Sequence, residues 1–191
     1  DEIIMPSFSY VGVANSFANL GAKLVLQDID PETMNIDSNL LESAITAKTK
    51  AVVIMHYGGV ACEMKKIVEI CKQRNIVLIE DNAQGIGATY HDIPLGSFGD
   101  FSCISFDSLK NISCGEGGVL LYKEKFTKSV DVCFENGTNR NDFSEGKVEY
   151  YEWVNRGSKF AISEFNAAIL YPLLLNTETI TDTRKERWQK L

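Results

Sequence analysis

The chain alternates short apolar runs with stretches in which apolar residues recur every three or four positions. Residues 51–56 (AVVIMH) and 76–81 (IVLIED) are apolar almost throughout, which is typical of strands buried on both faces. Between them, residues 63–74 have helical spacing, with their apolar side chains on one face. This alternation predicts crossover connections and therefore an α/β fold, with a mostly parallel sheet and helices on both faces.

The remaining predicted elements continue this alternation. Strands are expected at residues 3–5, 23–28, 101–106 and 118–122, and helices at 13–20, 40–45, 124–134 and 162–175. Asp37 or Ser38 is expected to cap the helix at 40–45. Residues 136–148 are rich in Gly, Asn and charged residues, a composition that predicts a long mobile loop.

Both ends of the chain look like interior segments of a larger protein. Residues 3–6 have the pattern of a strand already under way, and residues 183–191 form a charged helical run. The 191 residues are enough for one domain and few for two. We therefore expect a domain that is incomplete at both ends.

The charge balance narrows the class of partner. With 19 basic and 26 acidic residues the formal net charge is −7, which argues against nucleic acid or an anionic membrane as the main partner. No signal peptide or bilayer-length apolar stretch is visible, so a cytoplasmic location is expected. The five cysteines are odd in number and contain no C-x-x-C pair, which indicates free thiols in a reducing compartment. His56 and His91 stand near no cluster of ligands, so no metal site is expected.

Polar residues follow three of the predicted strands. His56 ends one strand, Asp81 ends the next with Gln84 one turn later, and Ser105 ends a third with Lys110 five residues beyond. In open α/β sheets ligands bind beyond the carboxyl ends of the strands, so these residues can deliver an acid, a hydroxyl and an amine to one crevice. For His56, a hydrogen-bonded core imidazole and a substrate contact remain equally open.

These residue types match the needs of pyridoxal phosphate. That cofactor requires a lysine for its Schiff base, a carboxylate at its ring nitrogen and donors for its phosphate. The lysine, once released, moves a proton between the substrate and the cofactor. Lys110 and Asp81 can fill the first two roles. Taken singly, each has a plainer interpretation, as a surface lysine and as a helix cap.

Six motifs together carry a resemblance to a known family: MPSFSYVGVANSF, DPETMNID, HYGGVACEM, EDNAQG, SFDSLKNISCGEGG and ENGTNR. Through essentially its whole length the chain resembles the DegT/DnrJ/EryC1/StrS sugar aminotransferases. Within that family it is most similar to the transaminases that make dTDP-4-amino-4,6-dideoxygalactose, through HYGGVACEM and through GTNR followed by YYEWVNRGS.

The resemblance implies an aspartate-aminotransferase-like large domain (PLP fold type I). Residues 1–191 would be its central part, and the C-terminal small domain would be absent. It also implies a homodimer that uses pyridoxal 5'-phosphate to transfer an amino group from glutamate to a dTDP-4-keto-6-deoxyhexose, in the synthesis of lipopolysaccharide or another surface antigen.

Site residues follow from the resemblance position by position. Lys110 matches the Schiff-base lysine, and Asp81 matches the partner of the pyridine nitrogen. Gln84 matches a glutamine beside the ring and its 3-hydroxyl, and Ser105 a serine that contacts the phosphate. Tyr10 stands where the family places an aromatic residue stacked on the cofactor.

Two departures from the family pattern leave an alternative open. Asp107 stands where the family usually has histidine, and Lys159 lies in a stretch that in the family reaches across the dimer to the neighbour's phosphate. Lys159 is therefore a candidate substitute phosphate donor. The departures also suit a non-catalytic or regulatory relative, inactive as a truncated chain. Lys110 and Asp81 favour the enzyme, and Lys110 also disfavours a sugar dehydratase, because relatives with that reaction replace this lysine.

Overall fold

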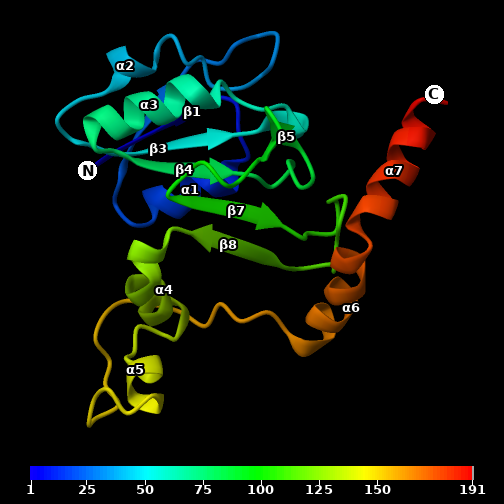
Figure 1. Ribbon diagram of the computed structural model, residues 1–191. Helices are drawn as coiled ribbons and strands as arrows, with labels where there is room; N and C mark the ends of the chain where they lie inside the picture. Colours follow the sequence, from blue (N-terminus) through cyan, green and yellow to red (C-terminus); the bar gives the residue numbers. More distant parts are fainter. Residues whose placement is uncertain (191) are drawn as a thin grey trace.

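A six-stranded sheet forms the centre of the computed structural model, which describes residues 1–190 (Figure 1). The strand order is β2-β1-β3-β4-β7-β8. The strands are β1 (Glu2–Pro6), β2 (Lys23–Gln27), β3 (Thr49–Met55), β4 (Val77–Asp81), β7 (Phe101–Ser105) and β8 (Gly118–Tyr122). All neighbours are parallel except β8, which runs antiparallel to β7. The predicted α/β fold with a mostly parallel sheet is confirmed.

Helices connect the strands and extend beyond the last one. They are α1 (Val11–Ala18), α2 (Leu41–Ala44), α3 (Met64–Arg74), α4 (Thr127–Phe134), α5 (Arg140–Ser144), α6 (Glu164–Leu175) and α7 (Thr177–Trp188), with 3-10 turns at Tyr57–Gly59 and Glu124–Phe126. A small hairpin joins β5 (Thr89–Tyr90) to β6 (Ile93–Pro94). In residues 1–190 no helix combines the length and the apolar composition that a bilayer crossing needs.

Helices cover both faces of the sheet, as the continuous apolar run of β3 predicts. On one face Val52 and Ile54 pack with Met64 and Ile67 of α3. On the other face Val53 packs in a cluster with α1. Since alternate residues of a strand point to opposite faces, β3 needs apolar side chains at nearly every position.

Two local expectations were wrong, and a third was met in part. The N-cap of α2 is Leu40 and not Asp37 or Ser38, and the Asp37 carboxylate accepts from the Asn39 N–H at 2.8 Å. The helix expected at 124–134 is divided into a 3-10 turn and α4. The expected long loop at 136–148 contains α5, whose N-cap Asn139 bonds the Tyr150 carbonyl and the Glu152 N–H. The predicted helical run at 183–191 is the last part of α7 as far as Trp188, and Leu191 lies outside the described residues.

Candidate active site at the carboxyl edge of the sheet

Register places the candidate residues at one edge and on one face. Asp81 pairs with Met55 of β3 and with Cys103 of β7. Ile79, two residues before Asp81, packs in the α1 cluster, so Asp81 points to the α1 face. Ser105 lies two residues after Cys103 and therefore points to that face as well.

Asp81 is a buried carboxylate with an unfilled acceptor. The residue is 8% exposed, and its Oδ1 accepts from the Ala83 N–H at 3.1 Å. Within residues 1–190 no hydrogen bond reaches Oδ2. Burial raises the pKa of Asp81, while the Ala83 N–H and the positive charge of Lys110 act in the opposite direction. The Lys110 ammonium therefore lies within electrostatic reach of this carboxylate.

A short turn after β7 positions Lys110. The Asp107 N–H donates to Ser105 Oγ at 3.3 Å, the Asp107 carboxylate accepts from the Leu109 N–H at 3.0 Å, and the Lys110 N–H donates to the Asp107 carbonyl at 2.9 Å. Asp107, the residue that departs from the family pattern, thus organises the turn. Lys110 itself is half-buried. Gly115, five residues after Lys110, has a φ of +87°, in the left-handed region that favours glycine.

Gln84 and Tyr10 come to the same edge from two further connections. Gln84 Oε1 accepts from the Gly58 N–H at 2.6 Å, which ties the loop after β4 to the turn after β3. Tyr10 is the residue before α1 and is 72% exposed. Its ring is therefore not part of the core and is open to a ligand.

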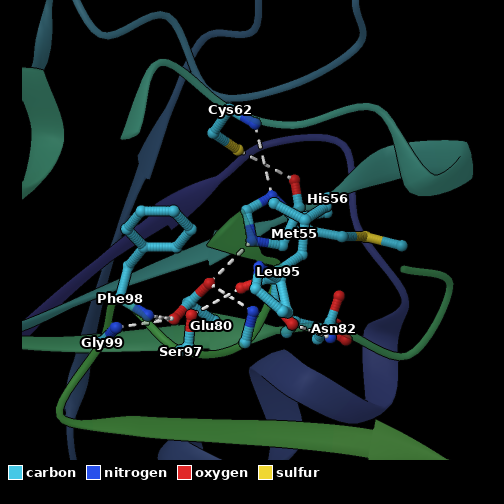
Figure 2. A network of polar contacts seen from close by, with 12 residues as sticks. Met55, His56, Cys62, Glu80, Asn82, Leu95, Ser97, Phe98 and Gly99 are labelled. Carbon is cyan, nitrogen blue, oxygen red and sulfur yellow. Dashed lines mark hydrogen bonds and ion pairs between the residues drawn. The ribbon is translucent and has the colours of Figure 1, made fainter. Parts of the chain in front are cut away.

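His56 is a hydrogen-bonded core imidazole, which decides between the two interpretations left open by the sequence. It is 0% exposed, and its Nε2 lies 3.0 Å from Glu80 Oε2 (Figure 2). Sequence reasoning did not single out Glu80. The available signal was an acid in a strand predicted to be buried on both faces, where a carboxylate needs partners.

Comparison with known proteins identifies the family. The sequence profile of the DegT/DnrJ/EryC1/StrS aminotransferase family matches residues 1–191. The chain belongs to this family. It is 33% identical over 190 residues to the spore coat polysaccharide biosynthesis protein SpsC of Bacillus subtilis, covering 97% of this chain and 49% of SpsC. It is also 44% identical over 120 residues to GDP-perosamine synthase of Caulobacter vibrioides, covering 63% and 32% of the two chains.

A solved aminotransferase structure has the same fold. The PMP-form of the putative sugar aminotransferase Spr1654 from Streptococcus pneumoniae superposes with a TM-score of 0.87 and 26% identity, over 97% of this chain and 53% of that one. This agreement confirms the predicted aminotransferase fold. The chain spans about half the length of the curated relatives it matches.

Pyridoxal phosphate is the cofactor of the DegT/DnrJ/EryC1/StrS family, and the donor set at this edge fits it. Asp81 Oδ2 has room for one more donor, as a protonated ring nitrogen requires. The Lys110 amine is near that carboxylate, and the Ser105 hydroxyl lies on the same face of the sheet. These groups come from separate strand ends that the parallel register brings together.

Lys159 is not brought to this edge. Its Nζ pairs with Glu135 Oε2 at 3.6 Å, just after α4. Because β8 runs antiparallel, α4 starts from the amino edge of the parallel strands, away from Asp81 (Figure 1). A role for Lys159 at the neighbouring subunit's site stays a prediction.

A groove of about 750 Å³ lies beside the Lys110 turn. Its lining combines three residues from the connections after β3, β4 and β7 with residues of α7 and its C-cap, several of them basic. These residues are Gly58, Ile86, Asn111, Thr181, Arg184, Lys185, Arg187, Trp188 and Gln189. α6 and the start of α7 lie beside the loop that follows β7 in Figure 1 (orange to red). A second hollow, of about 550 Å³, is lined by residues of α4 and α5 and contains none of the candidate residues.

Proposed function

We propose that this chain is the cofactor-binding part of a pyridoxal-phosphate-dependent nucleotide-sugar aminotransferase. The observation that carries the proposal is geometric: the parallel register brings Asp81, with one carboxylate oxygen that accepts no hydrogen bond from residues 1–190, to the same edge of the sheet as the turn that holds Lys110. A non-catalytic protein of the same fold would gain nothing from this carboxylate, because burial disfavours its charged form and raises its pKa.

Each residue has a defined task in this proposal. The cofactor, when bound, supplies an aldehyde carbon and a ring that takes up electrons. Asp81 holds a proton on the ring nitrogen, and Lys110 Nζ moves a proton to and from the substrate carbon that carries the nitrogen. The Ser105 hydroxyl donates to the phosphate, Gln84 lies beside the ring, and Tyr10 covers one ring face.

The proposed substrates are a dTDP-4-keto-6-deoxyhexose and glutamate, giving dTDP-4-amino-4,6-dideoxygalactose. Two observations support a nucleotide sugar. GDP-perosamine synthase, a relative, is named for one. The groove beside the Lys110 turn also presents Arg184 and Arg187, and guanidinium groups suit a diphosphate. By family resemblance we propose that the active protein is a homodimer.

An absorption spectrum tests the proposal. Pyridoxal phosphate added to the complete protein should produce a visible band that glutamate bleaches and that Lys110→Ala abolishes. Lys65→Ala, which removes an exposed lysine of α3, is the matched control and should keep the band. A band that survives Lys110→Ala would show that another lysine carries the cofactor. Incubation with a dTDP-4-keto sugar and glutamate then tests for the amino sugar.

A further inference from the structure

Glu80 is a buried carboxylate whose two oxygens each have two hydrogen-bond donors (Figure 2). It is 0% exposed. Its Oε1 accepts from the N–H groups of Phe98 at 2.8 Å and Gly99 at 2.6 Å. Its Oε2 accepts from the Gly96 N–H at 2.9 Å and meets His56 Nε2 at 3.0 Å. A carboxylate with four donors is stable in a dry interior, whereas one left unpaired is not.

The hydrogen bonds of His56 assign its tautomer. The Cys62 N–H donates to Nδ1 at 3.3 Å, so Nδ1 is an acceptor and the proton is on Nε2. Nε2–H therefore donates to Glu80. Burial alone would raise the pKa of Glu80, but the bonds from His56, Gly99 and Gly96 hold it below its usual range. The pair is an ionised carboxylate and a neutral imidazole.

His56 also bonds the candidate active site through its main chain. Its N–H donates to the Asp81 carbonyl at 3.2 Å. His56 therefore bonds two successive residues of β4, Glu80 through its ring and Asp81 through its backbone. Two residues further on, the Gly58 N–H holds the Gln84 side chain. The connections after β3 and β4 are thereby fixed to each other.

Residues 96–99, which supply three N–H donors to Glu80, pack closely around its carboxylate. Gly96 has φ of +94°, and a Cβ there would lie 2.8 Å from Asn82 Nδ2 and from Ser102 Oγ. Asn82 Nδ2 in turn donates to the Leu95 carbonyl at 2.9 Å. The residue after Asp81 is therefore held by the same segment that supplies three of the donors to Glu80.

We infer that Glu80 and His56 are a positioning pair, which fixes Asp81 and Gln84 for the cofactor ring from the opposite face of the sheet without touching the ring. The geometric part of this inference stands on the hydrogen bonds alone, and only its effect on the cofactor rests on the proposed function. Glu80→Gln tests this inference. In either orientation of the glutamine amide, its NH2 group would face backbone N–H groups that now donate to Glu80, so at least one hydrogen bond is lost.

The matched control is Asp100→Asn. Asp100 is a buried carboxylate at the other end of β4, where it accepts from the Leu78 N–H at 3.1 Å and pairs with Lys125 at 2.9 Å. Asp100→Asn changes the bonds at the amino end of β4 and leaves the side-chain partners of Glu80 and His56 in place. Both variants are made in the complete protein.

Two readouts separate the geometry from the function. Without added cofactor, Glu80→Gln should raise amide hydrogen exchange at least about tenfold in residues 56–62 and 81–85, while Asp100→Asn leaves these segments unchanged. With pyridoxal phosphate, Glu80→Gln should weaken the apparent affinity tenfold or more and shift the pH at which the visible band changes. Unchanged exchange in both segments would overturn the inference, whatever the cofactor does.

A second pair of variants covers the case in which Glu80→Gln does not fold. His56→Leu removes one donor and leaves the three backbone donors, so it should reproduce the exchange effect more weakly. His56→Gln, whose side-chain N–H can still reach Glu80, should restore most of the protection. If wild type shows no visible band while the exchange results hold, the proposed function is wrong and the positioning pair remains.

Discussion

Glu80 and Asp81 are consecutive residues of β4 whose carboxylates lie on opposite faces of the sheet. Leu78 packs in the α3 cluster and Ile79 in the α1 cluster, so the alternation places Glu80 with α3 and Asp81 with α1. Glu80 accepts four hydrogen bonds and has its pKa held below the usual range. Asp81 accepts one side-chain bond and has a raised pKa. The bonds of Glu80 therefore stabilise the fold, whereas Asp81 keeps an acceptor available for a ligand.

Asp81→Asn should make the cofactor-free protein more stable at neutral pH. Because the folded-state pKa of Asp81 is raised, its favourable contribution is complete below its ordinary value of 3.8 and is lost as pH rises through the raised value. Above that, wild type carries a buried charge that the variant lacks. Urea unfolding should give a higher midpoint for Asp81→Asn at pH 7 and a smaller difference near pH 4, with loss of cofactor binding. A lower midpoint at pH 7 would contradict this assignment.

The cysteines should differ sharply in reactivity. Burial raises the pKa of the Cys62 and Cys71 thiols to about 12, whereas Cys133 is exposed on α4. Because the thiolate is the reactive form, iodoacetamide at pH 8 should label Cys133 and leave Cys62 and Cys71 unlabelled until denaturant is added. Peptide mass spectrometry reads out each site. Labelling of Cys62 in the native protein would show that the His56 loop opens.

Arg187→Ala should weaken binding of the nucleotide sugar and leave binding of glutamate unchanged. A charge-assisted hydrogen bond is worth about 1.5–3 kcal/mol, so the KM for the keto-sugar nucleotide should rise roughly tenfold or more. Steady-state kinetics with each substrate varied in turn provides the measurement. Arg74→Ala, an exposed arginine of α3 near Glu42, should leave both KM values unchanged. An equal rise for both substrates would argue against a diphosphate in the groove.

Lys159→Ala should lower cofactor affinity several-fold if Lys159 reaches the neighbouring subunit's phosphate. The Lys159 side chain is 54% exposed, so losing its ion pair with Glu135 should change stability by about 1 kcal/mol or less, and the affinity change cannot come from unfolding. Titration of the visible band against pyridoxal phosphate, beside thermal unfolding of the same sample, checks both statements. An unchanged affinity would end the proposal for this residue.

Ile54→Ala should destabilise the protein by about 2–5 kcal/mol, since a fully buried side chain between β3 and α3 would be replaced by a cavity. Leu26→Ala, at a side chain that is 60% exposed, should change stability by roughly 0.5 kcal/mol or less. Urea unfolding of both variants compares them directly. Similar losses at the two positions would contradict the described packing of β3.

The sequence predicts β3 and the strand-edge position of Asp81 because both depend on local pattern. An apolar run of that length is typical of a strand that is buried on both faces. A residue that ends such a run in a parallel sheet, as Asp81 ends the run 76–81, lies at the carboxyl edge. Glu80 could not be interpreted in this way, because its N–H donors from Gly96 and Gly99 are 16 and 19 residues away. Likewise α5 was missed because the bonds of Asn139 reach Tyr150 and Glu152, beyond any local window.

The antiparallel pairing of β7 with β8 has an entropic consequence for the Lys110 amine. Ser105 pairs with Gly118, and the Phe106 N–H donates to the Gly117 carbonyl at 2.8 Å, so the connection that carries Lys110 is closed at its base. The Cys114 N–H closes it a second time, at the Phe106 carbonyl, with a bond of 3.0 Å. Most of the conformational freedom of this loop is therefore lost when the sheet forms. A ligand that binds the Lys110 amine therefore loses little binding free energy to ordering this loop.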